Sequence, residues 1–338
     1  MKIAVLSPVA WRTPPRHYGP WEQMSSNISE GLIHEGHEVT LFATGDSISS
    51  GKVESVIESG YEEDKTRDAK VVECLHISNV MEMAADFDII HNNFDFLPLT
   101  YSRLIKTPMV TTIHGFSSPK IIPVYKKYNK TSSYISISNS DRSSELNYLA
   151  TVYNGLRLSE FTFQEKPKDY LLFMGRIHPD KGAAEAIQIA QKAGLPLKIA
   201  GIIQHQEYFD KEVKPYINED ISFEGHVGPV VRNELLGNAL ALLHPISFNE
   251  PFGLSVAESM LCGTPVIAYN RGSMPELIRH GKTGYLVDNK VEAGEALSDL
   301  NKISRLECRK WAESHFSQEK MVQQYLSIYQ MIIDSLNP

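Results

Sequence analysis

The chain of 338 residues is 42% hydrophobic, 22% charged and 9% aromatic, a composition typical of globular enzymes that excludes a fibre, a disordered tail and a disulfide scaffold. Its 33 Lys and Arg residues against 41 Asp and Glu give a formal charge of -8, which argues against a nucleic-acid partner. This length predicts two domains, with the cleft between them as the default place for a site.

Cysteine spacing and the lengths of apolar stretches indicate the cellular compartment of the protein. Its three cysteines lie far apart and form no CxxC pair, so we expect neither a disulfide framework nor a zinc site. The apolar stretch from Ile3 to Leu6 is interrupted by Pro8 and is too short for a signal peptide. No later stretch reaches the roughly 20 apolar residues of a membrane-spanning helix. The sequence therefore predicts a soluble, cytoplasmic protein.

The first half of the chain alternates short apolar runs with helical patterns. Apolar and β-branched residues predict strands buried on both faces within residues 2–9, 38–45, 87–93, 108–115, 133–140 and 150–155. This alternation is typical of a parallel sheet with helices on both faces. A polar stretch from Glu160 to Asp169 marks the domain boundary, so we predict a first domain of residues 1–160.

The second half repeats this rhythm. Strands are predicted within residues 169–176, 197–203, 221–227, 239–247, 265–270 and 283–287, with helices at 182–194 and 253–263. From Arg305 onward only helical spacing remains, for example at Met321, Tyr325 and Ile328. We predict an α/β protein with a second domain of residues 161–315 and a C-terminal helix, 316–338, that packs back on the first domain.

The strongest functional signal is the segment NEPFGLSVAE, which ends at Glu258 and follows the predicted strand 239–247. Ligands of open α/β sheets gather at the carboxyl ends of the strands. Gly253 lets the backbone approach a ligand, and the amides of Gly253, Leu254 and Ser255 open a helix whose N-terminus attracts a diphosphate. Glu258 can accept two hydrogen bonds from a vicinal diol such as a ribose, and Glu250 can reach hydroxyls of the group that the diphosphate carries.

A second signal is the segment GRIHPDKG, residues 175–182, between a predicted strand and a predicted helix. Arg176 offers a planar fork of donors and Lys181 a point charge, so together they can neutralise a diphosphate as it leaves. Two solvated surface cations are the alternative interpretation. The glutamate segment beside them favours the diphosphate.

The motifs YGPWEQ, GHEVTLFATGDS, THG, VYNG, GRIHPDKG and NEPFGLSVAESMLCGTPVIA occur in this order over nearly the whole chain. Together they resemble the retaining nucleotide-sugar glycosyltransferases of family four, which have the GT-B fold. The resemblance implies two Rossmann-like domains facing each other across a cleft, the C-terminal one binding the donor and the N-terminal one the acceptor. It implies transfer of a hexosyl group from a nucleoside-diphosphate sugar to an acceptor hydroxyl, with retention. We expect no metal or cofactor, because Arg176, Lys181 and a helix N-terminus already supply the positive charge that a metal would provide.

The resemblance also implies a role for residues at matching positions of the donor domain. Arg176 and Lys181 would hold the diphosphate and Glu258 the ribose. Glu250 would hold the hydroxyls of the transferred sugar, assisted by backbone amides of the residues that follow it, namely Phe252, Gly253 and Leu254.

In the N-terminal domain, the resemblance implies that His114 contacts the sugar and that Gly19 lets the first loop approach the donor phosphates. The chain departs from the family pattern at two positions. Pro20 stands where a second glycine is usual and has no N–H to donate. Arg157 stands where an aspartate is common, which we interpret as variation at the hinge.

Acceptor-binding candidates lie in two loops of the N-terminal domain. One loop carries cationic groups for an anionic acceptor, and the other carries groups that can bind sugar hydroxyls. The candidates are Arg12, Arg16 and His17 in the first loop and Asn92, Asn93 and Asp95 in the second. Ordinary loop polarity is the alternative for all six.

Other functions stay open at this point. A nucleotide-sugar hydrolase or epimerase, or a phosphorylase, could use the same fold. A non-catalytic sugar-nucleotide sensor is a further alternative, but a sensor has no need of the cations that stabilise a leaving diphosphate.

Two further segments have a plain interpretation. Asp86 and Asp88 spell the DxD of metal-dependent glycosyltransferases, but they precede a strand, at its amino end, so we expect no metal site. Residues 119–130 combine four lysines with apolar side chains and could rest on anionic lipid. We favour a solvated helix for this segment, because the net negative charge of the protein opposes binding to anionic lipid. The sequence leaves open whether the protein forms a homo-oligomer.

Overall fold

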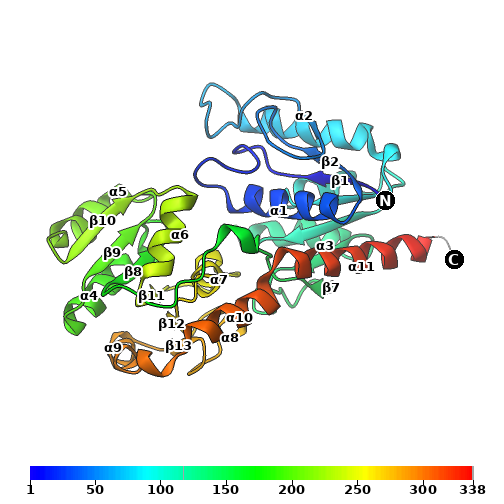
Figure 1. The fold of residues 1–338 in the computed structure, drawn as a ribbon. Helices are drawn as coiled ribbons and strands as arrows, with labels where there is room; N and C mark the ends of the chain where they lie inside the picture. The colour runs from blue at the N-terminus through cyan, green and yellow to red at the C-terminus, as the bar shows by residue number, and fades with distance from the viewer. Residues whose placement is uncertain (117, 337–338) are drawn as a thin grey trace. The chain divides into compact units, whose positions relative to one another are not determined.

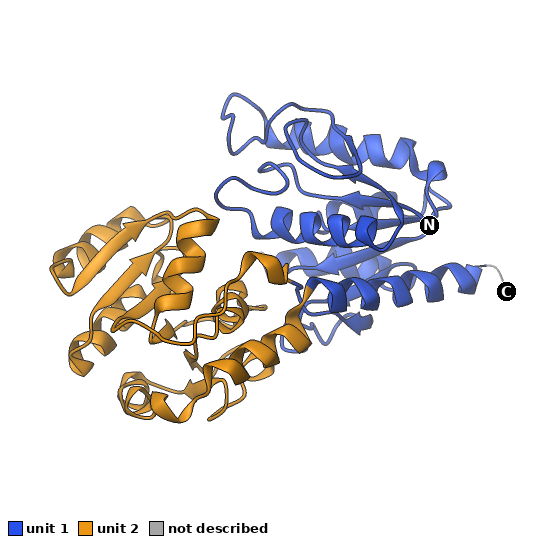
Figure 2. Ribbon diagram, in the orientation of Figure 1, with its two compact units in different colours: residues 1–155, 318–338 blue, residues 156–317 orange. Residues whose placement is uncertain are grey.

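The computed structural model describes residues 1–116 and 118–336, which form two α/β units (Figures 1 and 2). Unit 1 comprises residues 1–155 and 318–338, and unit 2 comprises residues 156–317. Each unit contains one sheet in which all pairs of strands are parallel. The predicted fold class, two Rossmann-like α/β domains, is confirmed. The chain crosses between the units at residues 155 and 156, whereas the prediction placed the division at 160 and 161.

Unit 1 has a seven-stranded sheet of order β3-β2-β1-β4-β5-β6-β7. Its strands are β1 Lys2–Leu6, β2 Glu38–Phe42, β3 Lys52–Glu54, β4 Ile89–Asn92, β5 Met109–Ile113, β6 Ser133–Ser136 and β7 Tyr148–Thr151. Its helices are α1 Pro20–His34, α2 Ala69–Glu82, α3 Ile122–Tyr128 and α11 Gln318–Leu336, with short 3-10 turns η1 Ala84–Asp86, η2 Leu97–Tyr101 and η3 Pro119–Ile121.

Helices cover both faces of this sheet. In β1, Ala4 and Leu6 pack into a core with α2 and α3, whereas Ile3 and Val5 pack into a core with α1 and α11. This alternation explains why the strand reads as a continuous apolar run. The C-terminal helix α11 lies against α1, where Gly31 leaves room for Val322.

A buried polar network also ties α11 to the sheet of unit 1. His91 of β4 pairs through Nε2 with Thr112 Oγ1 at 2.8 Å and through Nδ1 with the Tyr329 hydroxyl at 2.6 Å. Thr112 Oγ1 also lies 2.9 Å from the Tyr325 hydroxyl. Burial lowers the pKa of His91 to about 3, so its ring stays neutral in this network.

Unit 2 has a six-stranded sheet of order β10-β9-β8-β11-β12-β13. Its strands are β8 Leu171–Met174, β9 Leu197–Ala200, β10 Ile221–Gly225, β11 Ala241–His244, β12 Val266–Tyr269 and β13 Gly284–Val287. Its α-helices are α4 Ala183–Ala193, α5 Gln206–Tyr208, α6 Pro229–Asn238, α7 Leu254–Leu261, α8 Met274–Leu277, α9 Lys290–Ser298 and α10 Arg305–Phe316. The shorter turns are η4 Leu158–Glu160, η5 Pro179–Lys181, the π-helical η6 Phe209–Val213, η7 Lys214–Tyr216 and η8 Leu300–Lys302.

Apolar spacing builds the core of unit 2. In α4, buried residues such as Ala186, Ile187 and Ala190 pack with Leu171 and Phe173 of β8. Leu172, which points to the other face of the sheet, is also fully buried, and α7 packs against both α6 and α10. In the part of the chain that the structure describes, no helix is long and apolar enough to cross a membrane.

Candidate functional site

The sheet of unit 2 has its topological switch point between β8 and β11. From β8 the chain moves outward to β9 and β10, and it then returns to the other side of β8 as β11. The loops that follow the two strands lie at the carboxyl edge of the sheet, at the point where open α/β sheets bind ligands. These loops are residues 175–182 and 245–253, which carry both functional signals of the sequence.

Lys181 and Glu250 form an ion pair at this switch point, through Nζ and Oε2. Their side chains are only 14% and 12% exposed. Lys181 Nζ also lies 4.7 Å from the ring centroid of Phe248, in the same loop as Glu250. The two segments that carry the functional signals of the sequence are therefore in direct contact.

Burial by itself would raise the pKa of Glu250, but the contacts of its carboxylate outweigh that effect. His244 and Lys181 together lower the pKa of Glu250 to about 2. His244 ends β11, and its Nε2 lies 3.7 Å from Glu250 Oε2. Burial lowers the pKa of His244, so the ring is neutral at pH 7. Glu250 is thus ionised at any physiological pH and can accept hydrogen bonds from hydroxyls.

Two glycines let the backbone close around this ion pair. Gly253 precedes α7 with a φ of 89°, in the left-handed region that favours glycine, and an added Cβ would lie 2.8 Å from Met274 Cε. Gly182, with a φ of 78°, lies so close to the Pro245 carbonyl that a Cβ would meet its oxygen at 2.1 Å. Since Gly253 has no side chain, the first amides of α7 carry no side-chain cap. Positive potential from α7 is therefore available to an anion.

Glu258 lies one turn into α7 and is 7% exposed. Its Oε1 is 3.1 Å from Arg232 Nη1 of α6. The guanidinium of Arg232 also lies over the Phe161 ring, 5.8 Å from its centroid. Helix α6 thus holds the carboxylate that the sequence assigns to the ribose.

Arg176 lies directly after β8 and has partners within its own edge of the sheet. It donates a hydrogen bond to Gln204 Oε1, and its Nη2 lies 3.6 Å from Asp180 Oδ2. Its side chain is 23% exposed, so the guanidinium remains accessible to a further anion. Asp180 is shared with His178, whose Nδ1 lies 2.6 Å from Asp180 Oδ1.

Unit 1 has its own topological switch point, between β1 and β4. The loops that follow these strands contain Gly19 and five of the six acceptor candidates, and the sixth, Asn92, is the last residue of β4. At the same edge, His114 follows β5 and is 9% exposed. Its Nε2 lies 2.9 Å from Asn93 Oδ1, and its ring centroid is 6.0 Å from that of Trp21. Burial lowers the pKa of His114 to about 3, so this ring is neutral.

Gly19 is the N-cap of α1, and Pro20 occupies the first helical position. Proline suits this position because its missing N–H has no helical partner there. Glu22, in the first turn, is 3% exposed and accepts a hydrogen bond from the Trp11 amide at 3.3 Å. Burial raises the pKa of Glu22 to about 7. The loop after β1 is therefore fixed to α1 by a buried carboxyl group.

The cationic acceptor candidates lie on this loop. Arg12 donates to the Pro14 carbonyl at 2.9 Å. Arg16 forms two ion pairs of 2.9 Å, with Asp46 and Glu63, and His17 beside it is exposed. An anionic acceptor at Arg16 would therefore have to compete with two carboxylates.

The polar candidates at the end of β4 and in the loop after it hold that loop together. Asn92 is fully buried and donates to the Asp95 carbonyl at 2.8 Å and to Thr111 Oγ1 at 3.1 Å. Asp95 has a φ of 95° and accepts a hydrogen bond from the Tyr125 hydroxyl. Burial raises the pKa of Asp95 to about 6. These contacts give Asn92 and Asp95 a structural task, whereas Asn93 lies beside His114.

The DxD segment lies at the amino edge of the sheet in unit 1, as the sequence indicates. Asp86 ends η1, and Asp88 Oδ2 accepts a hydrogen bond from the Lys2 amide at 2.7 Å. Within residues 1–116 and 118–336, no group of three or more His, Cys, Asp or Glu side chains is arranged to hold a metal ion.

The lysine-rich segment 119–130 turns its apolar side inward. Ile122, Tyr125 and Tyr128 of α3 are buried, and Lys126 forms an ion pair with Glu145 at 2.6 Å. The buried apolar residues of α3 therefore belong to the core of unit 1, whereas Lys126 and Lys127 are exposed.

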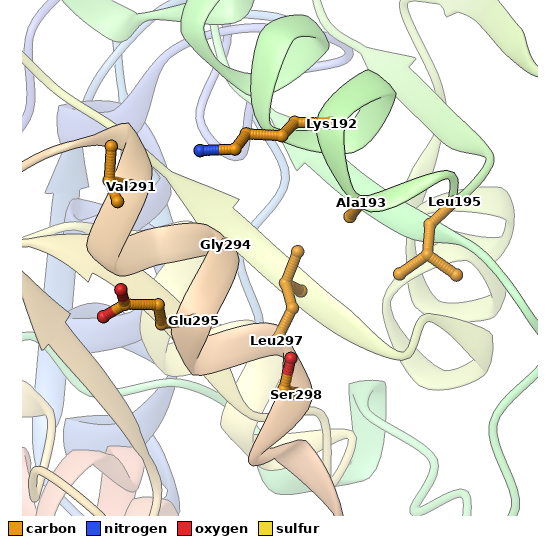
Figure 3. Close-up of a pocket in the computed structure, with 8 residues that line it drawn as sticks. All are labelled: Lys192, Ala193, Leu195, Val291, Gly294, Glu295, Leu297 and Ser298. Carbon is orange, nitrogen blue, oxygen red and sulfur yellow. The ribbon is translucent and has the colours of Figure 1, made fainter.

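Unit 2 also has a shallow depression between α4 and α9 (Figure 3). It is lined by Lys192 in the last turn of α4, by Leu195, and by Glu295 and Leu297 of α9. Helix α4 runs from the carboxyl end of β8 to the amino end of β9, so this depression lies at the opposite edge from Lys181 and Glu250.

Residues 158–317, nearly the whole of unit 2, match the family model described as glycosyl transferases group 1. Unit 2 is a group 1 glycosyltransferase domain. An uncharacterized glycosyltransferase of Methanocaldococcus jannaschii, MJ1607, is 25% identical over 85% of this chain and 85% of its own length.

Solved structures extend the similarity to the whole chain. AviGT4, a glycosyltransferase involved in avilamycin A biosynthesis, matches with a TM-score of 0.75 at 23% identity, over 99% of this chain and 98% of that protein. Anabaena HepE, in complex with UDP and glucose, matches with a TM-score of 0.74 at 18% identity, over 98% of this chain and all of that protein. These matches confirm the GT-B fold that the sequence resemblance implies.

Sequence reasoning missed two residues of this glycosyltransferase domain. His244 could have been found as the one polar residue that closes an otherwise apolar strand, next to the glutamate segment. Arg232 had no such signal, because its pairing with Glu258 depends on how α6 packs beside α7.

Proposed function

We propose that this chain is a retaining glycosyltransferase that moves a hexosyl group from a nucleoside-diphosphate sugar to an acceptor hydroxyl, without a metal ion or a cofactor. The observation that carries the proposal is the ion pair of Lys181 and Glu250 at the β8/β11 switch point, in front of the uncapped N-terminus of α7. A cation and a helix N-terminus suit a diphosphate, and an ionised carboxylate beside them suits sugar hydroxyls.

The proposal gives each group in unit 2 one task. Arg176, Lys181 and the amides of Phe252, Gly253 and Leu254 stabilise the negative charge that grows on the departing diphosphate. Glu250 orients the sugar, and Glu258 holds the ribose. The anionic leaving group helps to deprotonate the acceptor hydroxyl on the same face of the sugar, which gives retention. Unit 1 would bind the acceptor, and His114 would contact the transferred sugar.

One observation supports this choice of donor, and a second supports glycosyl transfer. HepE, a structural match, was solved with UDP and glucose bound. Two D-inositol 3-phosphate glycosyltransferases, which are 31% and 34% identical over 40% and 39% of this chain, are also among its relatives. A non-catalytic sensor would have no use for the buried cation Lys181 beside the sugar carboxylate.

The test begins with thermal unfolding in the presence of uridine, guanosine, adenosine and thymidine diphosphates and the corresponding diphosphate glucoses. A ligand at about 100 times its dissociation constant stabilises the protein by roughly 2.7 kcal/mol. The nucleotide that stabilises is then used with sugar acceptors, and the anomeric configuration of the product is read by NMR.

We expect one nucleotide to stabilise and the product to keep the configuration of the donor. Hydrolysis or epimerisation without transfer, or transfer that requires inorganic phosphate, would support one of the alternative reactions on this fold. Failure of every nucleotide to bind would refute the proposal.

A further inference from the structure

His244 is a buried polar residue to which neither the sequence motifs nor the proposed function gives a task. It closes β11 at the carboxyl edge of unit 2 and is 4% exposed. Its Nε2 has no hydrogen-bond partner among the described residues. The nearest acceptor is Glu250 Oε2 at 3.7 Å, which is beyond hydrogen-bond distance. A buried polar atom without a partner is unusual and calls for an explanation.

Glu250 stands between two donors of different character. Lys181 is already in hydrogen-bond contact with Oε2, whereas His244 faces the same oxygen from β11. Lys181 and Glu250 are also the charged groups that act on His244, the carboxylate raising its pKa and the ammonium lowering it. Burial is the larger effect, so His244 is a neutral donor and Lys181 a charged one.

A donor diphosphate would change this balance. If the proposed function is correct, the diphosphate attracts the ammonium of Lys181, because a phosphate group carries more charge than one carboxylate. Glu250 would then lose part of its contact with Lys181 while it remains buried and must stay ionised to bind sugar hydroxyls. A buried carboxylate without a donor is costly.

We infer that His244 is a positioning residue for Glu250, an inference that rests on the proposed function. Its Nε2–H donates a hydrogen bond to the carboxylate when Lys181 turns to the diphosphate. A shift of less than 1 Å is enough to bring 3.7 Å to hydrogen-bond distance. As a neutral group, His244 orients Glu250 without adding a cation that would compete with Lys181 for it. His244 touches no reacting atom and acts through Glu250 alone.

The test compares His244→Leu with His244→Gln, because glutamine keeps an N–H donor and leucine removes it. The nucleotide sugar found by the thermal screen is the donor. We expect His244→Leu to lower kcat/KM by about 10- to 100-fold, the effect of losing one hydrogen bond to a charged group. His244→Leu should also weaken the bare nucleoside diphosphate in calorimetry, but by less than it lowers kcat/KM, because the diphosphate draws Lys181 away and leaves Glu250 without a donor. His244→Gln should recover most of the activity, and His280→Leu, at an exposed histidine of unit 2, is the matched control.

The pH profile separates this role from a merely structural one. In the donor complex, where Lys181 has turned to the diphosphate, His244→Leu leaves Glu250 without this donor, so its pKa rises and the acid limb of kcat moves to higher pH. A folded His244→Leu enzyme with the wild-type pH profile overturns the inference and leaves the proposed function standing. Equal losses of diphosphate affinity and of transfer also overturn it, because they indicate general damage.

If neither variant folds, the inference can still be tested on the wild-type protein. Nitrogen NMR of selectively labelled histidine, with each signal assigned by substitution of the other histidines, reports which ring nitrogen of His244 carries the proton. Protonation at Nε2, with a stronger hydrogen bond after addition of the bound diphosphate, is the expected result. Protonation at Nδ1 overturns the inference. Absence of any nucleotide binding is a separate result, which refutes the proposed function.

Discussion

Arg232 of α6 and Glu258 of α7 form an ion pair in which Nη1 lies 3.1 Å from Oε1. The carboxylate that we assign to the ribose is therefore held by a cation and does not move freely. An ionised carboxylate offers about four lone-pair sites, so this contact leaves room for the hydroxyls of a diol. The orientation of Glu258 is fixed before a ligand arrives, which reduces the entropy lost on binding.

Substitution of Glu258 and of Glu250 should have different effects on the affinity for a nucleoside diphosphate. We expect Glu258→Ala to weaken the bare nucleoside diphosphate by about tenfold or more, since it removes hydrogen bonds to the ribose. Glu250→Ala should leave that affinity nearly intact and impair transfer from the complete nucleotide sugar. Calorimetry on both variants, with exposed Glu295→Ala as the control, checks this division. Equal loss of diphosphate affinity in both would contradict it.

The cations at the switch point should act on the leaving group. Arg176→Ala and Lys181→Ala each remove charge-assisted hydrogen bonds, so kcat/KM should fall by roughly 10- to 100-fold. Lys192→Ala, in the depression at the opposite edge of unit 2, is the matched control and should leave kcat/KM unchanged. Steady-state kinetics on folded protein provide the measurement. Transfer at the wild-type rate in either cation variant would show that the assignment is wrong.

The ion pair of Lys181 and Glu250 predicts a pH-dependent stability difference. Folding lowers the pKa of Glu250 to about 2, so this carboxylate stabilises the fold above its unfolded pKa and loses that contribution as the pH falls toward 2. Lys181→Met should raise the pKa of Glu250. The free energy of unfolding of Lys181→Met should therefore fall short of the wild-type value by most above about pH 5, and the difference should shrink below about pH 4.

Urea denaturation at several pH values measures this difference. Lys302→Met is the control, because the Lys302 ion pair with Asp299 is exposed and should make no pH-dependent difference that can be measured. A deficit of Lys181→Met that stays constant across this range would argue against an ionised Glu250 in the folded protein.

The buried network around His91 should stabilise unit 1. Tyr329→Phe removes the hydroxyl that pairs with His91 Nδ1 at 2.6 Å and leaves that nitrogen buried without a partner. We expect a loss of about 1–3 kcal/mol in the free energy of unfolding. Tyr101→Phe serves as the control, since the Tyr101 hydroxyl makes no hydrogen bond to the described residues. Equal stability of the two variants would mean that His91 finds another partner.

Turnover should not depend on a metal ion. Chelation with EDTA, or Asp88→Asn, should leave the rate within about twofold of the untreated enzyme, a change of under roughly 0.5 kcal/mol in the barrier. The Asp88 carboxylate accepts the Lys2 amide at the amino edge of unit 1, and asparagine keeps an oxygen for that contact. Loss of activity on chelation that magnesium or manganese restores would refute metal independence.

The strands and the donor segments could be predicted because they depend on local patterns. Alternate residues of β1 pack into two different cores, and this produces the apolar run that the sequence shows. The short edge strand β3 was missed, because Lys52–Glu54 has one apolar residue and no fully buried side chain. Glu250 and Gly253 could be found because a loop and a helix start are contiguous in sequence.

Pairings between distant elements could not be predicted in this way. Nothing near Arg16 indicates that Asp46 and Glu63 neutralise it, since these carboxylates lie 30 and 47 residues further along the chain. The same holds for Asn93, which the sequence offered as a sugar ligand and which the structure places against His114. Contacts of this kind depend on the packing of the sheet, which local patterns do not encode.

The return of α11 to unit 1 has a consequence for synthesis on the ribosome. Unit 2 is continuous, and its first and last residues are neighbours, because the Leu156 amide donates to the Phe316 carbonyl at 2.8 Å. Domains fold as units while the chain emerges. Unit 2 has all its residues once Ser317 has left the exit tunnel, whereas unit 1, begun first, still lacks the helix that covers Ile3, Val5 and His91. Until residues 318–336 have emerged, this apolar face of the sheet in unit 1 is covered by α1 alone.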